Sequence, residues 1–219
     1  MVTRKDFIIV IFATVFHSCK TPNPAHSSMT SSARSNDSIL LDTNGNGYQV
    51  KLFSDNILWM TSNLNLNILG SYCYDDKKEN CEHYGRLYTW ESAGKGCSLL
   101  GDGWRLPTKE EWRELITLYG GITKDSNETR KEAYKALMQA GNSKFNAVLG
   151  GGRDFEGHYS RLEAHGFYWT ATENDSSMAW FYNFGKGSQS LYQQDGGEKT
   201  RAFSVRCVKS IDSLKQIRR

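Results

Sequence analysis

The side chains that could do acid–base or metal chemistry are few in this sequence. Asp154 and Glu156 alternate in a polar segment and could pair as general acid and general base, although an ordinary surface turn explains them equally well. His158 and His165 lie seven residues apart among glycines, a spacing typical of neither a metal pair nor a triad, so we interpret both as solvated loop residues. His83 is the other histidine of the region, and no serine lies in a nucleophile elbow. We therefore predict no catalytic residue, no metal and no cofactor.

The five cysteines are an odd number, which calls for an explanation in a secreted chain. Assigning Cys19 to a lipid leaves Cys73, Cys81, Cys97 and Cys207, which can pair in three ways. Cys73 and Cys81 bracket a polar run that could close as a small loop, and Cys97 and Cys207 would then join the middle of the domain to its last strand. A zinc site is the alternative, but the Cys-x-x-Cys spacing is absent. The short loop would contribute about 2–3 kcal/mol to stability and the long one about 5 kcal/mol.

The N-terminus resembles a bacterial lipoprotein signal. Arg4 and Lys5 precede an apolar run over residues 7–16, which is too short to span a membrane and ends before Ser18 and Cys19. We predict a signal peptide over residues 1–18 and acylation of Cys19, with palmitate as one of its lipids. The alternative is an ordinary cleaved signal. The prediction places the protein in the bacterial cell envelope, lipid-anchored at the outer membrane.

The remaining chain divides into three parts. Residues 19–38 comprise the acylated cysteine and a Ser-rich tether with almost nothing to bury. Residues 39–209 form one domain, and residues 210–219 are a polar tail. The net charge of +3 falls to +2 when the signal peptide is removed, and basic residues form no long cluster. Together with the compartment, this charge excludes a nucleic-acid partner.

The domain begins with a turn and two short strands. Asn44-Gly45-Asn46-Gly47 favours a hairpin turn, and the alternation of Tyr48, Val50 and Leu52 predicts an edge strand after it. The spacing from Asp42 also resembles the start of a calcium loop, but Phe53 stands where such a loop needs Glu. Residues 57–60 predict a second, buried strand.

Helices are predicted in the middle of the domain. A short one is expected over residues 87–93. A longer one begins with a capping box of Thr108 and Glu111, continues with an apolar face led by Trp112, and stops at Gly120. Another helix is expected over residues 128–139. Aromatic strands are predicted at 167–172 and 179–184, and a closing strand at 202–208. Helices grouped between strands indicate the α+β class.

Several segments resemble one bacterial family, the Fibrobacter succinogenes major paralogous domain (FISUMP), a lipoprotein-associated module. They run in order over residues 42–208: Asp42-x-Asn44-Gly45-Asn46-x-Tyr48, Trp59-Met60-x-x-Asn63-Leu64, Cys81-x-x-Tyr84-Gly85-Arg86-Leu87-Tyr88-Thr89-Trp90, Gly103-Trp104-Arg105-Leu106-Pro107-Thr108-x-x-Glu111-Trp112, Phe145-Asn146-Ala147, Tyr168-Trp169-Thr170 and Ser204-Val205-Arg206-Cys207. The chain departs from the family's pattern at residues 53–58 and 95–103, where we expect altered turns.

The segment Arg105-Leu106-Pro107-Thr108-x-x-Glu111-Trp112 is also similar to formylglycine-generating enzymes. This resemblance implies a C-type-lectin-like fold, with twisted antiparallel strands, short helices and long loops. Those enzymes resemble one another in a close pair of redox-active cysteines near the C-terminus, where this chain has only Cys207. The resemblance therefore does not extend to their activity. Calcium-dependent lectins resemble one another in Pro-containing motifs, and no proline follows Pro107 here.

Binding remains as the predicted role. Six Trp, eleven Tyr and ten Phe are many for this length, and we expect most Trp residues to be core. Ligand-binding candidates flank loops, where aromatic rings beside amides suit a sugar or a protein hot spot: Tyr159, Trp180, Tyr182, Tyr192, Asn183 and Gln193. We predict a non-catalytic envelope module that binds an envelope protein or an extracellular glycan, including as a carbohydrate-binding accessory to polysaccharide use. An enzyme related to the formylglycine-generating enzymes is the alternative that we disfavour.

Overall fold

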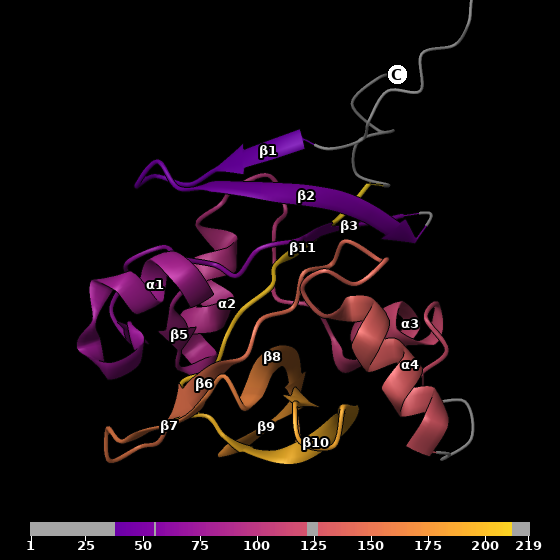
Figure 1. The fold of residues 1–219 in the computed structure, drawn as a ribbon. Coiled ribbons are helices and arrows are strands. Elements are labelled where there is room, and N and C mark those ends of the chain that lie inside the picture. Colours follow the sequence, from indigo (N-terminus) through magenta and orange to yellow (C-terminus); the bar gives the residue numbers. More distant parts are fainter. Residues whose placement is uncertain (1–37, 55, 122–126, 212–219) are drawn as a thin grey trace, which may run out of the picture. The chain divides into compact units, whose positions relative to one another are not determined.

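The computed structural model places helices between two blocks of strands (Figure 1). It describes residues 38–54, 56–121 and 127–211. The predicted signal peptide, the acylated Cys19, nearly all of the tether and the tail from residue 212 lie outside these ranges. The mixed helices and antiparallel sheets confirm the α+β class. Among the described helices, none has the length and apolar character needed to cross a membrane.

The first sheet is antiparallel, with the order β1-β2-β3-β11. Its strands are β1 (Ser38–Leu41), β2 (Gly47–Ser54), β3 (Ile57–Met60) and β11 (Val208–Ser210). Asp42 closes the predicted β1–β2 hairpin turn, because its carboxylate accepts the N–H groups of Asn44 and Asn46 at 2.8 and 2.9 Å. The prediction of β2 as an edge strand is wrong, since β1 precedes the turn and takes the edge.

The second sheet has the order β10-β9-β8-β6-β7. Its strands are β6 (Gly150–Arg153), β7 (Tyr159–Leu162), β8 (His165–Glu173), β9 (Met178–Gly185) and β10 (Ser190–Glu198), and only β6 and β8 pair in parallel. The two predicted aromatic strands lie inside β8 and β9. A third, two-stranded sheet joins β4 (Ser71–Tyr72) to β5 (Leu87–Tyr88).

The helices are α1 (Lys78–Tyr84), α2 (Trp90–Ser98), α3 (Lys109–Thr117) and α4 (Asn127–Leu137), with a 3₁₀ turn η1 (Tyr74–Asp76). The prediction of a helix from Leu87 is wrong at its start. Leu87 and Tyr88 are extended because Tyr88 exchanges backbone hydrogen bonds with Phe203, at 2.8 and 3.0 Å, and this tertiary pairing overrides local helical pattern. The helix starts after Thr89.

The capping box of α3 is confirmed. Thr108 accepts the N–H of Glu111 at 3.2 Å, and the Glu111 carboxylate accepts the N–H of Thr108 at 2.9 Å. Arg105 holds the same carboxylate, with a 2.7 Å bond from Nη1 to Oε2. The Glu111 carboxylate therefore accepts hydrogen bonds from both Thr108 and Arg105, and these bonds fix the start of α3. The predicted helix at 128–139 is confirmed as α4.

The core centres on Trp112 of α3. Its indole contacts Trp59 of β3 at 5.0 Å between ring centroids and stacks on Tyr182 of β9 at 5.4 Å. Trp59, Trp104 and Trp169 are buried as predicted, whereas Trp90 is only partly buried. Trp112 thus joins α3 to both large sheets.

The closing segment links the sheets without being the strand predicted at 202–208. Residues 202–204 make isolated bridges, including Phe203 to Tyr88, and regular pairing starts only at Val208 (Figure 1). Between them, the carbonyls of Val205 and Cys207 accept the N–H groups of Leu64 and Met60. The chain changes partners at nearly every residue here, which prevents one continuous ladder.

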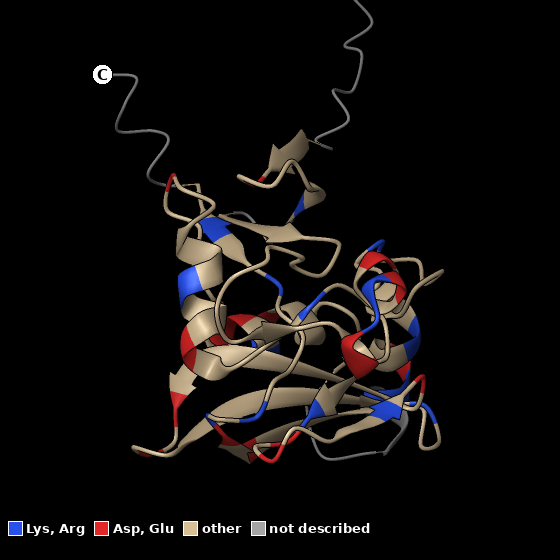
Figure 2. Ribbon diagram, turned by 90° about the vertical axis from the view of Figure 1, so that its left-hand side faces the viewer, with Lys and Arg blue, Asp and Glu red and all other residues tan. Residues whose placement is uncertain are grey.

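Both predicted disulfides are present. Cys73–Cys81 brackets η1 and the start of α1, and Cys97–Cys207 joins α2 to the closing segment. Figure 2 shows basic and acidic residues interspersed along the helices, with neither sign covering a whole element.

Candidate functional site: a cleft lined by carboxamides

A polar cleft of about 620 Å³ opens beside α1, where the start of β2 meets three irregular segments. Its size is within the range of small-molecule sites. Six carboxamide side chains line it, and we call it the amide cleft. Its lining is Asn46, Gly47, Tyr48, Gln49, Thr61, Ser62, Asn63, Asn65, Cys81, Glu82, His83, Tyr84, Gly85, Gln139, Asn146, Val148 and Arg206.

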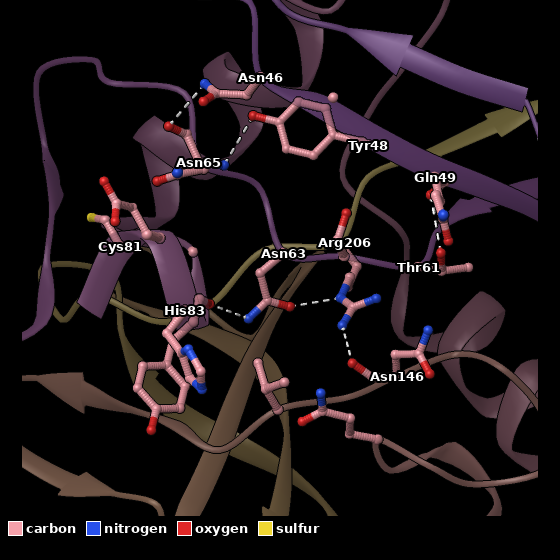
Figure 3. A pocket seen from close by; sticks show the side chains of 17 residues that line it. Asn46, Tyr48, Gln49, Thr61, Asn63, Asn65, Cys81, His83, Asn146 and Arg206 are labelled. Carbon is pink, nitrogen blue, oxygen red and sulfur yellow. Dashed lines mark hydrogen bonds between the residues drawn. The ribbon is translucent and has the colours of Figure 1, made fainter. Parts of the chain in front are cut away.

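Arg206 lies at the base of the amide cleft and is fully buried. Its Nε donates to Oδ1 of Asn63 at 2.6 Å, and Nη2 donates to the carbonyl of Asn146 at 2.7 Å (Figure 3). Nη1 donates to the carbonyls of Phe145 and Met60 at 2.8 and 3.2 Å. Four of its five N–H groups are thus used to fasten three separate segments together.

No carboxylate accepts a hydrogen bond from Arg206 in the part of the chain that the structure describes. Burial therefore lowers the pKa of its guanidinium, since the charged form loses water without gaining a counterion. The ring of Phe145 lies 4.7 Å from Cζ and offers partial compensation. Arg206 thus acts as a brace whose charge is met by neutral oxygens.

A second brace surrounds Tyr48. Its hydroxyl donates to Oδ2 of Asp42 at 2.6 Å. The same hydroxyl accepts the backbone N–H of Asn65 at 3.1 Å (Figure 3). Burial and then the hydrogen bond to Asp42 raise the pKa of Tyr48, so it stays protonated. Asn46 donates from its side chain to the same carboxylate at 2.8 Å. The sequence suggested Asp42 as a calcium-loop residue. Its carboxylate instead stabilises the hairpin turn and holds the Tyr48 hydroxyl, which in turn positions Asn65.

The wall formed by α1 is held by Asn63 and Gly85. Asn63 donates from Nδ2 to the carbonyl of Tyr84 at 2.8 Å. Gly85 has φ of +75°, and a Cβ there would lie 2.6 Å from Cβ of Asn63. Only glycine permits this close approach. The Cys73–Cys81 disulfide anchors the same wall, and Nη1 of Arg86 lies 3.3 and 3.5 Å from its two sulfurs.

Other polar side chains of the amide cleft have no partner within the described ranges. The side chains of six residues make no hydrogen bond there: Gln49, Ser62, Asn65, His83, Gln139 and Asn146. The hydroxyl of Ser62 is itself buried without a partner. Gln49, His83 and Gln139 are exposed, and Asn65 and Asn146 are partly exposed, so a ligand in the cleft can reach the side chains of these five residues. The arrangement can supply several neutral donors and acceptors to one ligand.

The ligand-binding candidates from the sequence lie elsewhere. Tyr159 is on β7, where it donates to Asp76 at 2.7 Å, and burial followed by this bond raises its pKa to about 12. Trp180 is on β9 beneath Nζ of Lys109, at 4.2 Å. Since β7 and β10 are opposite edges of the sheet, the structure does not bring Tyr159 together with Tyr192.

Four of the candidates lie on the neighbouring strands β9 and β10, as two cross-strand pairs. Asn183 of β9 and Tyr192 of β10 are cross-strand partners, and both are partly exposed. Oδ1 of Asn183 contacts Nδ1 of His165 at 2.9 Å, and the His165 ring stacks on Phe167 at 5.5 Å. His165 is thus a packed strand residue, and its interpretation as a solvated loop histidine is wrong.

Tyr182 offers no ring face to a ligand. It is fully buried because even-numbered residues of β9 point toward α3 and α4. Its hydroxyl donates to the carbonyl of Lys109 at 2.9 Å and lies 3.2 Å from Oε1 of Gln193. Gln193 therefore supports a core contact.

Asp154, Glu156 and His158 are brought together in the β6–β7 turn. Nδ1 of His158 lies 3.4 Å from a carboxylate oxygen of Asp154 and 3.5 Å from one of Glu156. Glu156 and His158 are exposed, and Asp154 accepts the N–H of His158 at 2.8 Å. That bond, with the charge of His158, holds the pKa of Asp154 below its usual range. The contacts match the predicted surface turn.

The amide cleft is not among the sites predicted from the sequence. Asn63, Asn146 and Arg206 appeared only as parts of separate family segments. Tyr84-Gly85 and Asn46 belonged to two further segments. One feature of the sequence could have indicated the cleft. These segments contain amides, one arginine and a glycine at positions that no apolar core pattern explains. Their meeting in one place depends on long-range pairing that spacing does not reveal.

Comparison with known proteins agrees with the resemblance seen in the sequence. No curated protein and no solved structure compared with the chain is significantly similar to it. The model of the Fibrobacter succinogenes major domain matches residues 46–209, which include all of the amide cleft. The chain therefore belongs to the Fibrobacter succinogenes major domain family.

Proposed function

We propose that this protein is a non-catalytic binding module of the cell envelope and that the amide cleft holds its ligand. The observation that carries the proposal is the division of polar groups in the cleft. One set, led by Arg206, Asn63 and Tyr48, is consumed by internal hydrogen bonds. The other set has no internal partner among the described residues and lies on the surface of the cleft. A braced site with unused polar groups is preorganised for binding.

The envelope location rests on the sequence. The charged and apolar segments before Cys19 support export and acylation, and residues 20–38 would tether the domain on the order of 25 Å from the bilayer. Two disulfides are consistent with an oxidising compartment outside the cytosol. We also propose that the lipid anchors the protein at the outer membrane. No nucleic-acid partner is proposed.

The finer fold assignment is also a proposal. A C-type-lectin-like fold related to formylglycine-generating enzymes is supported by the Arg105-to-Trp112 segment and its locked helix start. Curled antiparallel strands and short helices suit such a fold. The described part of the chain supplies no redox cysteine pair for the enzyme reaction, because Cys207 is bonded to Cys97.

A test starts from the full-length lipoprotein, tagged and recovered from its own envelope in mild detergent. Polysaccharide and protein that accompany it are analysed for the wild type and for the double variant Asn65→Ala/Gln139→Ala. Gln194→Ala is the matched control, since Gln194 is an exposed amide on β10 outside the cleft lining. We expect material to be lost from the double variant and retained by the control. Equal recovery by all three would overturn the proposal.

A protein partner is the second candidate, favoured by an apolar groove of about 400 Å³. It is lined by Trp90, Leu106 and Ala171, together with polar residues of α2 and the α3 start. Half-buried tryptophan is common at protein hot spots. Ala171 is exposed, so Ala171→Glu places a charge in the groove without disturbing the core. Stoichiometric recovery of one protein that depends on Ala171, and not on the amide cleft, would favour this candidate.

A further inference from the structure

The charge distribution in the amide cleft limits what can bind there. Among its described lining residues, Glu82 is the one carboxylate and Arg206 the one strongly basic side chain. Glu82 is exposed and faces Lys78, with 3.4 Å between the charged atoms. Arg206 is fully buried and has spent four N–H groups on oxygens of the protein. Arg206 therefore has at most one N–H left for an opposite charge on a ligand, and the one carboxylate of the described lining is a solvated surface residue.

A charged ligand would therefore be disfavoured. It would lose water on entering the cleft without gaining an ion pair, and an uncompensated buried charge is costly. A purely apolar ligand would cover the carboxamides of Asn65 and Asn146, which have no internal partner, and would leave them unsatisfied. Leaving such groups without a partner is penalised more than a typical hydrogen bond is rewarded.

The groups without an internal partner fit vicinal hydroxyls. Each carboxamide of Gln49, Asn65, Gln139 and Asn146 offers N–H donors and a carbonyl acceptor at neighbouring positions. Adjacent hydroxyls of a pyranose ring likewise donate and accept side by side. The rings of His83 and Tyr84, which contact each other at 5.0 Å, add aromatic surface on one wall. From this donor set, we infer that the amide cleft binds a neutral oligosaccharide segment.

This inference rests on the proposed function and adds the ligand class to it. The experiment measures binding of the full chain in mild detergent to immobilised mannan and β-glucan as neutral probes, and to polygalacturonate as an acidic probe. The same three proteins are compared: the double variant Asn65→Ala/Gln139→Ala, the control Gln194→Ala and the wild type. Each measurement is repeated at low and high sodium chloride.

We expect the wild type to bind a neutral polysaccharide, with an affinity that changes little with salt because no charge pairs form. The double variant should bind at least about tenfold more weakly, as expected for the loss of cleft hydrogen bonds, and Gln194→Ala should bind normally. Circular dichroism of each variant checks that the fold is intact.

Three results would overturn the inference in distinguishable ways. Salt-sensitive binding of polygalacturonate that the double variant loses would refute the neutral ligand and leave the amide cleft as the site. Binding of a neutral polysaccharide that all variants share would refute the cleft itself. Retention on none of the three probes would refute a polysaccharide ligand, and the envelope recovery experiment would then identify a different one.

Discussion

Asn63 and Arg206 are 143 positions apart in the sequence, and their side chains meet at 2.6 Å at the base of the amide cleft. Asn63 accepts from the guanidinium with Oδ1 and donates to the α1 wall with Nδ2. Asn63 therefore connects Arg206 of the closing segment to the α1 wall of the cleft. Asn65, two residues further on, has a side chain with no internal partner in the described structure.

This pair of asparagines should separate stability from binding. Asn63→Ala leaves Nε of the buried Arg206 without an acceptor, so we expect the free energy of unfolding to fall by about 3 kcal/mol. Asn65→Ala removes no internal hydrogen bond and should stay within about 0.5 kcal/mol of the wild type. Chemical denaturation monitored by tryptophan fluorescence measures both. Equal stability of the two variants would show that the brace at Arg206 contributes nothing.

The start of α3 should weaken in acid. Burial raises the pKa of Glu111, but the hydrogen bonds from Arg105 and Thr108 outweigh it and hold the pKa below the ordinary value of 4.5. A carboxyl whose pKa is lowered by folding stabilises the protein above its unfolded pKa, and this contribution is lost as the pH falls through the folded pKa.

Glu111→Gln isolates this effect. The variant should be less stable than the wild type by about 1 kcal/mol at pH 7, because a hydrogen bond to a charged group becomes a neutral one. The difference should shrink as the pH falls below 4.5, since the wild type then loses its own charge. Melting curves between pH 7 and pH 3 measure it. Two parallel stability profiles would contradict the assignment.

The two disulfides should differ in their resistance to reduction. Cys97 and Cys207 are fully buried, whereas Cys73 is partly exposed. The guanidinium of Arg86 beside both sulfurs of the other pair would stabilise a thiolate there. A mild dithiol reductant under native conditions should therefore open Cys73–Cys81 first. Alkylation followed by peptide mass spectrometry identifies the open pair, and Arg86→Met should slow its reduction. Simultaneous opening of both pairs would be inconsistent with this account.

Gly85 should be intolerant of any side chain. Its φ of +75° and the 2.6 Å approach to Asn63 mean that Gly85→Ala strains the backbone and displaces the α1 wall. We expect a loss of at least about 2 kcal/mol in the free energy of unfolding. The matched control is Gly187→Ala, where a Cβ meets nothing within 4 Å, and its stability should change by less than about 1 kcal/mol. Wild-type stability of Gly85→Ala would mean that the wall can relax.

Local sequence patterns predicted the local parts of the fold well. The Thr108–Glu111 capping box, the Asp42 turn and the strand at 57–60 depend on residues a few positions apart, and each is present. These features need only spacing and side-chain chemistry. Both disulfides were also expected correctly, although Cys97 and Cys207 are 110 positions apart, because pairing the nearby Cys73 and Cys81 leaves only these two.

Features that depend on distant partners were missed. Leu87 and Tyr88 are extended because Phe203 pairs with Tyr88, and nothing near residue 87 indicates this. Tyr182 looked like a loop-flanking surface aromatic, but the strand turns its ring toward Trp112. The amide cleft combines residues from 46 to 206. Local sequence patterns do not show that these distant residues meet, so the cleft could be found only in the three-dimensional structure.

Hydrogen–deuterium exchange of the full chain, with and without oligosaccharides cut from the neutral polysaccharide that it binds best, tests the central claim most directly. Bound ligand should slow exchange in three segments that contribute to the lining of the amide cleft, residues 61–65, 81–85 and 139–148. Exchange in β9 and β10 should stay unchanged. Protection confined to β9 and β10, or to the groove beside Trp90, would place the binding site elsewhere and contradict the account.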